Sequence, residues 1–204
     1  MKQTAGPASQ RKPAKCLLPD IKVEDKDRLR FGGLAPRGLP AIALLLGGAV
    51  TKARPSFDWL AVSDAQSYEV ALRDDSGELL WEMQTKSTHL DYPSAEPALK
   101  SEKYEWEVKA MANNKPIAQQ IATLDIKPNQ ELSKPAPANP ADILLLAGAL
   151  ENEKYFSEAA ALYRRLRALD ANDSRLSYHL VWLYGNAGLI GAATDEYKKL
   201  NPTK

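Results

Sequence analysis

The C-terminal third of this 204-residue chain contains an internal repeat with a period of 34 residues. Within each unit, apolar residues recur every three or four positions, a pattern that predicts amphipathic helices. We expect two helix–turn–helix units, with helices at 141–153, 156–169, 174–186 and 189–200. A shift of 34 superposes five pairs, of which the two tyrosines are expected to fill grooves between neighbouring helices: Leu146 on Leu180, Leu150 on Tyr184, Ala159 on Ala193, Tyr163 on Tyr197 and Leu166 on Leu200.

Two such units are few for an array that stands alone. Each unit buries its apolar face mainly against its neighbours, and about three repeats are normally needed for stability. One end of the pair must therefore be covered by something else. The preceding strands, the N-terminal segment and a second copy of the chain are all candidates, so a homo-oligomer through the uncapped end is one open interpretation.

The residues from 40 to 128 predict a β-sandwich. Short segments alternate between apolar and polar residues and are separated by turns about every ten residues. We expect strands at 57–62, 66–73, 78–85, 103–110 and 117–126. The alternation is clearest at 103–110, where every second residue is apolar. The residues predicted to form the core are Trp59, Tyr68, Tyr104, Trp106 and Val108.

Composition marks the boundaries between these parts. Four prolines, Pro128, Pro135, Pro137 and Pro140, interrupt a polar stretch and predict an extended linker. Residues 1–37 hold nine Lys or Arg against four Asp or Glu and predict a flexible basic leader. The expected organisation is a multi-domain β + α chain, with a leader at 1–37, a sandwich at 40–128, a linker at 129–140 and helical hairpins at 141–201.

The longest apolar run, residues 41–50, allows two interpretations. It has the length of a signal-peptide core, with arginines before it and Thr51-Lys52-Ala53 as a cleavage site. However, about forty residues precede it, and Lys52 lies inside the cleavage motif. These facts favour a buried first β-strand that ends at Gly47–Gly48. No run reaches the ~18 apolar residues that a membrane span requires.

The aromatic spacing of the strand region resembles fibronectin type III-like sandwiches. A tyrosine at their corner packs its ring inward and returns its hydroxyl to the preceding backbone. The residues that carry this resemblance are Trp59, Ala65, Tyr68 and Val70 in the opening strands, then Leu99, Tyr104, Trp106, Val108 and Ala110.

The 34-residue period resembles tetratricopeptide repeats. Ala171 departs from that pattern where proline is usual, and Lys154 where glycine is common. The order of sandwich, proline linker and short array resembles a group of bacterial envelope-associated proteins, common in cyanobacteria. The segments 155–159 and 183–189 carry that likeness. It implies an interaction module of the periplasm or cell surface, without catalytic residues; a cytoplasmic location is the alternative.

The composition argues against catalysis. The chain has one cysteine, Cys16, and two histidines, His89 and His179, and neither histidine belongs to a metal-binding motif. A glycine-rich phosphate loop is missing too, because Gly47–Gly48 lacks the following lysine and helix. We expect no enzyme activity, cofactor or metal. With 27 Lys and Arg against 26 Asp and Glu, we expect no nucleic-acid partner either.

Two binding functions remain. The first is a scaffold or adaptor that binds a protein or peptide on the concave face of the helices. Tyr, Trp and Arg are enriched at binding hot spots. The residues expected on that face are Asn152, Arg175, Tyr178, Trp182 and Asn186. The alternative is a sandwich that binds carbohydrate or cell wall, with Trp81 and Tyr92 as stacking platforms if they face solvent.

Overall fold

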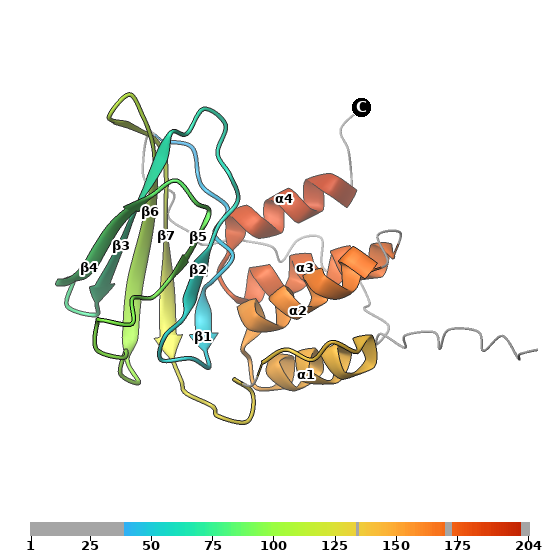
Figure 1. Cartoon of the computed structure of the whole chain (residues 1–204). Coiled ribbons are helices and arrows are strands. Elements are labelled where there is room, and N and C mark those ends of the chain that lie inside the picture. The colour runs from blue at the N-terminus through green and yellow to red at the C-terminus, as the bar shows by residue number, and fades with distance from the viewer. Residues whose placement is uncertain (1–38, 134, 170–172, 201–204) are drawn as a thin grey trace, which may run out of the picture.

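The computed structural model describes residues 39–133, 135–169 and 173–200; the predicted leader at 1–37, with Cys16, lies outside them. Figure 1 shows a sheet part (residues 39–128) beside a helical part (residues 140–200). The strands are β1 (Gly48–Val50), β2 (Ser56–Asp58), β3 (Ser67–Asp74), β4 (Leu79–Thr85), β5 (His89–Asp91), β6 (Lys103–Ala112) and β7 (Lys115–Ile126). The helices are α1 (Pro140–Asn152), α2 (Phe156–Leu169), α3 (Ser174–Asn186) and α4 (Ile190–Leu200).

The strands form two layers. The larger sheet has the order β1-β7-β6-β3-β4, in which β1 runs parallel to β7 and the other neighbours are antiparallel. The smaller sheet pairs β2 with β5. An aromatic cluster fills the space between the layers, since the Trp106 ring lies 5.0 Å from Phe57 and 6.4 Å from Trp59. The five residues predicted to form the core are all buried, which confirms the strand phase read from the sequence.

The tyrosine that was expected at a corner makes the expected bond. Tyr104 is buried, and its hydroxyl accepts a hydrogen bond from the Lys100 backbone N–H at 3.0 Å. The ring therefore lies inside while its polar end is satisfied by the loop that precedes β6.

The apolar run at 41–50 is part of the core, but the strand predicted within it is wrong in position. Regular pairing begins at Gly48, where the prediction ended, because Gly48 takes φ 71° and breaks the extended path before it. Earlier in the run, Leu44 makes only an isolated bridge to Trp59. Ile42, Leu44 and Leu46 are nevertheless buried, which favours a structural role over a cleaved leader.

The 34-residue period is repeated in backbone detail. Asn139 and Asp173, 34 residues apart, both cap a helix by accepting a hydrogen bond from a backbone N–H two residues later. The turns after α1 and α3 pass through a left-handed residue, Lys154 at φ 66° and Gly188 at φ 75°. In both turns the next N–H returns to a carbonyl five residues earlier, at 2.8 Å, as in a Schellman motif.

The side chains follow the period less closely than the backbone does. Ala159 and Ala193 are both buried, as their equivalence predicts. Tyr163 is also buried, but Tyr197 is 49% exposed, so the expectation that both tyrosines fill a groove is wrong for Tyr197. The physical reason is position in the chain: α3 follows α2 and packs on it, whereas α4 is the last described helix.

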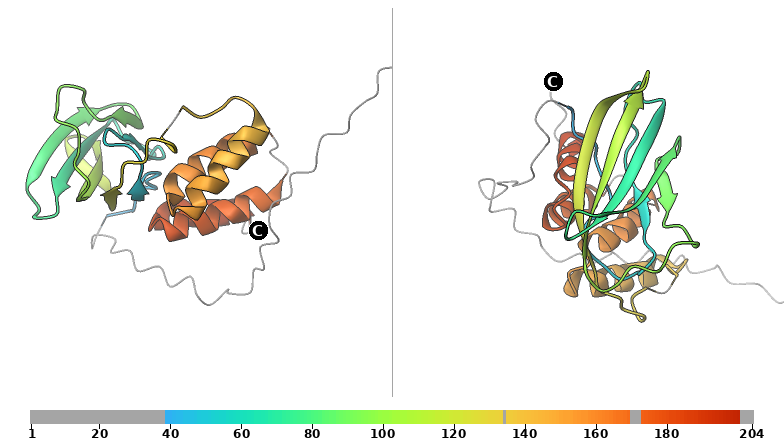
Figure 2. Two further views of the ribbon diagram at one scale, coloured as in Figure 1. Left: turned by 90° about the horizontal axis from the view of Figure 1, so that it is seen from below. Right: turned by 90° about the vertical axis from the view of Figure 1, so that its left-hand side faces the viewer.

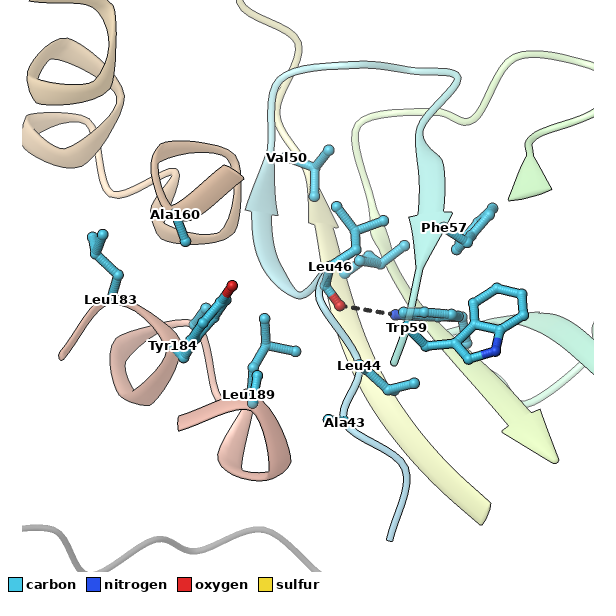
Figure 3. Close-up of a cluster of buried hydrophobic side chains, with 14 of the residues drawn as sticks. Ala43, Leu44, Leu46, Val50, Phe57, Trp59, Ala160, Leu183, Tyr184 and Leu189 are labelled. Carbon is cyan, nitrogen blue, oxygen red and sulfur yellow. Dashed lines mark hydrogen bonds between the residues drawn. The ribbon is translucent and has the colours of Figure 1, made fainter. Parts of the chain in front are cut away.

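The sheet part covers the ends of the helices that point toward it. Figure 3 shows Tyr184 and Leu189 facing Leu46 and Val50 across this boundary. The approach is close, because a Cβ on Gly47 would lie 2.7 Å from the Leu189 side chain. One continuous cluster of buried side chains runs from the sandwich into the helices. Of the covers considered for the short array, the strands therefore supply one.

The segment between the two parts is less extended than its prolines predict. Asn129 accepts backbone N–H bonds from Glu131 and Leu132 through its side chain, and its carbonyl accepts one from Ser133. Its own N–H donates to the Thr51 carbonyl at 3.2 Å. Residues 129–133 thus form a turn that is tied to the end of β1.

Trp106 offers a direct test of the sandwich core. Its side chain is fully buried, and its indole N–H donates to the Leu46 carbonyl at 3.2 Å. We expect Trp106→Ala to lower the free energy of unfolding by about 3–5 kcal/mol, because it leaves a large cavity and an unpaired carbonyl. Urea denaturation measures the change. Leu80→Ala, at an exposed position of β4, is the control, and an equal loss there would contradict the assignment.

The two equivalent turns give a second test. A left-handed backbone costs an L-residue about 1–2 kcal/mol, whereas glycine adopts it freely. We expect Lys154→Gly to raise the free energy of unfolding by about 0.5–1 kcal/mol and Gly188→Ala to lower it by about 1 kcal/mol. Opposite signs in urea denaturation would support equivalent turns. A loss in both variants would show that the Lys154 side chain contributes more than the backbone strain costs.

Candidate functional site

One face of α3 presents large side chains to solvent. Arg175, Tyr178, Trp182 and Asn186 follow one another at spacings of three, four and four residues, which places them on one side of a helix. All four are exposed, with Tyr178 at 39% and Trp182 at 42% of their surface. The opposite side of α3 faces the core, where Leu180 is fully buried. We call these four residues the α3 face.

Trp182 is exposed but held in place. Its ring meets Phe156, the first residue of α2, edge-on at 5.5 Å between centroids. It also stacks on the His179 ring at 5.7 Å with an interplanar angle of 12°. An aromatic ring fixed in this way loses little conformational entropy when it contacts a partner. The remaining exposed surface of Trp182 is therefore pre-organised for contact.

A buried polar cluster supports this ring from below. His179 is only 3% exposed, and its Nε2 lies 2.9 Å from an oxygen of Glu151 on α1. The Tyr163 hydroxyl on α2 donates to the same oxygen at 3.2 Å. The Tyr163 and His179 rings meet edge-on at 4.6 Å. Three helices are thus joined at one carboxylate, directly beneath Trp182.

The two ends of the α3 face are also fixed. The Arg175 guanidinium donates to both carboxylate oxygens of Asp173, the residue that caps α3, at 2.9 and 2.7 Å. These bonds hold the pKa of the Asp173 carboxyl below its ordinary value. At the other end, the Asn186 amide donates to the Trp182 carbonyl at 2.8 Å. Hence Arg175 presents its charge at a defined place.

Asn152, the fifth predicted site residue, lies apart from the other four. It is exposed near the end of α1, on the side of that helix opposite Ile143, which is buried. At about 100° per residue, nine positions separate the two by half a turn. The structure therefore brings together the four predicted residues of α3, while Asn152 faces away from α2.

Phe156, Glu151 and His179 were not among the predicted site residues. Phe156 belongs to the aromatic opening of α2, and its hydrophobic character was visible in the sequence. The pairing of Glu151 with His179 joins residues 28 positions apart on different helices, and neither residue type signals such a pairing by itself.

The aromatic residues proposed as sugar platforms are inside the sandwich. Trp81 is 7% and Tyr92 8% exposed, and their rings lie 6.1 Å apart. Trp81 also stacks on Phe57 at 5.8 Å, and the Tyr92 hydroxyl donates to the Pro97 carbonyl at 3.1 Å. Neither ring presents a free face for a carbohydrate.

His89 lies on the outside of the small sheet. Its Nδ1 is 2.8 Å from Asp58, and its Nε2 is 3.4 Å from Asp91. The hydrogen bond to Asp58 is the main cause that raises the pKa of His89 above its ordinary 6.5. Ser56 donates to Asp91 rather than to the histidine. This order does not match a hydrolase triad, in which the histidine is hydrogen-bonded to the nucleophile.

Glu158 connects the two parts of the molecule. Its two carboxylate oxygens accept hydrogen bonds from the Thr51 backbone N–H at 2.9 Å and from the Thr51 hydroxyl at 2.8 Å. Burial raises the pKa of Glu158 above its ordinary 4.5, against the bonds from Thr51 and the charge of Lys52, which lower it. A second bond runs nearby, from the Tyr155 hydroxyl to the Lys127 carbonyl at 3.0 Å.

No protein-family model matches this sequence, and no curated protein matches it significantly. Among solved structures, it is similar to a fibronectin type III domain of the human collagen alpha-1(XX) chain, with a TM-score of 0.37 and 18% identity. That match covers 49% of this chain and 92% of the other.

Two bacterial enzymes are also similar over part of their length. The apo β-glucuronidase of Ruminococcus gnavus has a TM-score of 0.28 and 18% identity, over 42% of this chain and 14% of that one. The FMN-binding β-glucuronidase of Facaelibacterium prausnitzii L2-6 has a TM-score of 0.30 and 15% identity, over 44% of this chain and 15% of that one. This chain spans only a small fraction of either glucuronidase, and these likenesses assign no activity to it. Within the described residues, no helix is both long and apolar enough to cross a membrane.

Glu158→Gln tests the connection between the parts by its pH dependence. The native carboxyl binds a proton more tightly than the unfolded one, so its burial costs stability at neutral pH. That cost disappears as the pH falls through the raised folded pKa toward 4.5. The glutamine variant keeps an acceptor and carries no charge. We expect it to be as stable as the native chain or more so at pH 7, and to lose this advantage near pH 4.5.

Urea denaturation across this pH range measures the difference between the two chains. Thr51→Val is the companion variant, because it removes the hydroxyl donor and leaves the backbone donor in place. We expect it to cost about 1–2 kcal/mol at pH 7. A difference between Glu158→Gln and the native chain that does not change with pH would refute the argument.

Proposed function

We propose that this chain is a non-catalytic scaffold or adaptor module that binds a protein or peptide segment through the α3 face. The observation that carries the proposal is the exposure of Tyr178 and Trp182 on a helix whose other large apolar residues are buried. Arg175 adds a fixed positive charge beside them. Aromatic side chains supply contact area and Arg pairs with an acidic group, so an extended segment that carries apolar and acidic residues is the natural ligand.

The helical part is proposed to be a pair of tetratricopeptide-like repeats. Its support is the agreement of the two helix caps, the two left-handed turns and the two buried alanines across 34 residues. In such arrays the first helix of each repeat lines the binding side. That role falls to α3 in the second repeat, consistent with its exposed aromatic residues.

We further propose a periplasmic or cell-envelope location, with a cytoplasmic one as the alternative. The support is the order of a strand-rich part, a proline-containing segment and helical hairpins, which resembles bacterial envelope proteins. The carbohydrate-binding alternative has lost its support, because Trp81 and Tyr92 are buried.

The double variant Tyr178→Ala with Trp182→Ala tests the binding role. Both side chains are substantially exposed, so we expect the free energy of unfolding to fall by about 1 kcal/mol or less. Capture of the partner from an extract of the source organism should be lost, since hot-spot residues dominate affinity. Urea denaturation and an affinity pull-down with the full chain measure the two effects.

Leu80→Ala with Met83→Ala is the matched control, because it removes a similar exposed apolar area from β4. This control should leave capture intact. A loss of several kcal/mol in the α3 double variant would mean that the face is internal packing. Retained capture with full stability would also reject the proposal.

A further inference from the structure

Helix α1 is apolar on all sides, although one of its sides faces solvent. Ile143, Ala147 and Leu150 are buried. The outward side carries Ala141, Leu145, Gly148 and Asn152, and Leu145 is 73% exposed. Seen from below in Figure 2, α1 lies in front of the other helices. A helix that is apolar all round is normally buried, so its outward side is expected to be covered in the working state of the protein.

The opposite end of the helical part is finished differently. On α4, Tyr197, Lys198 and Lys199 are exposed, and the buried residues lie on the other side of that helix. Terminal elements of repeat arrays need such a polar outer surface for solubility. The α4 end has one and the α1 end lacks it. The sheet part does not supply the cover either, because it contacts the ends of the helices (Figure 1).

We propose that α1 pairs with α1 of a second copy of this chain, antiparallel and about a two-fold axis. The outward residues are arranged symmetrically about the midpoint between residues 146 and 147. An antiparallel pair centred there places Leu145 of one copy over Gly148 of the other, and Ala141 over Asn152. Around Gly148 there is room, since a Cβ built on it meets no atom within 4 Å. The exposed leucine of each copy therefore fills the notch of its partner.

This self-complementarity is what selects a second copy as the occupant. A two-fold interface uses one patch twice, so its residues must match when the helix direction is reversed. The predicted dimer is weak. Thirteen residues span only about 20 Å, which offers less than the ~1,600 Å² of a standard stable interface. Asp142 and Glu153 at the edge of the face add like charges and limit the affinity further. The pairing is independent of the α3 face.

Sedimentation velocity of the full chain over a range of concentrations tests the proposal. We expect a monomer–dimer equilibrium in the native protein and at least tenfold weaker association in Leu145→Glu. Leu169→Glu is the control, because Leu169 is 66% exposed at the end of α2 and lies off the α1 face. It should associate as the native chain does. Gly148→Met is a second variant that fills the notch in a place where the monomer has room, and it should also dissociate the dimer.

Cross-linking tests the register. In a Cys16→Ser background, a chain with Ala141→Cys is mixed with a chain carrying Asn152→Cys and treated with a short bis-maleimide. The mixture should give a covalent dimer. Each chain alone should not, because eleven residues separate the two thiols by about 16 Å along the helices.

Three results would overturn the proposal: a native chain that is monomeric at every concentration, a dimer unaffected by both Leu145→Glu and Gly148→Met, or cross-links of equal yield in the unmixed chains. Loss of association equally in Leu169→Glu would mean that any new charge disrupts it, and would also reject the α1 face. Thermal melts of each variant show whether the monomer is folded, so that dissociation and unfolding are distinguished.

Discussion

Residues 42–50 form a strip that both halves of the molecule require. One side of the strip closes the sandwich, where Leu46 offers its carbonyl to the Trp106 indole. The other side meets α3, α4 and the turn between them so closely that glycine is needed. A Cβ on Gly191 would lie 3.1 Å from the Ala43 backbone. Because the strip is shared, neither half has a complete apolar core without it.

Polar bonds lie around this strip and not in place of it. Glu158 binds Thr51 directly after β1, and Tyr155 binds the carbonyl that follows β7. A buried carboxylate contributes little net stability, since removing it from water costs much of what its hydrogen bonds return. What these bonds add is orientation. They fix the start of α2 against the sheet, and Phe156 at that start in turn supports Trp182.

The sequence predicted the elements better than their assembly. Three of the four helices begin within one residue of their predicted positions and the fourth coincides, because caps, turns and a 34-residue period all mark the same boundaries. The three-residue strands β1 and β5 are too short to show alternation, so β5 was missed and β1 was misplaced. Tertiary pairs such as Gly47 with Leu189, or Glu151 with His179, depend on how distant segments meet. Local pattern has no access to them, and the same limit explains why Asn152 was grouped with α3.

The route of the contacts between sheet and helices has a consequence for how this chain can change over evolutionary time. Position is set by the strip at 42–50 and by Glu158, whereas residues 135–139 serve mainly to keep the two parts on one chain. The entropic cost of closing a loop grows only slowly with its length. Insertions at that point should therefore be tolerated while the angle between sandwich and helices stays constant. Lineages would be free to lengthen the tether, but an insertion near Gly47 would misalign everything on both sides of it.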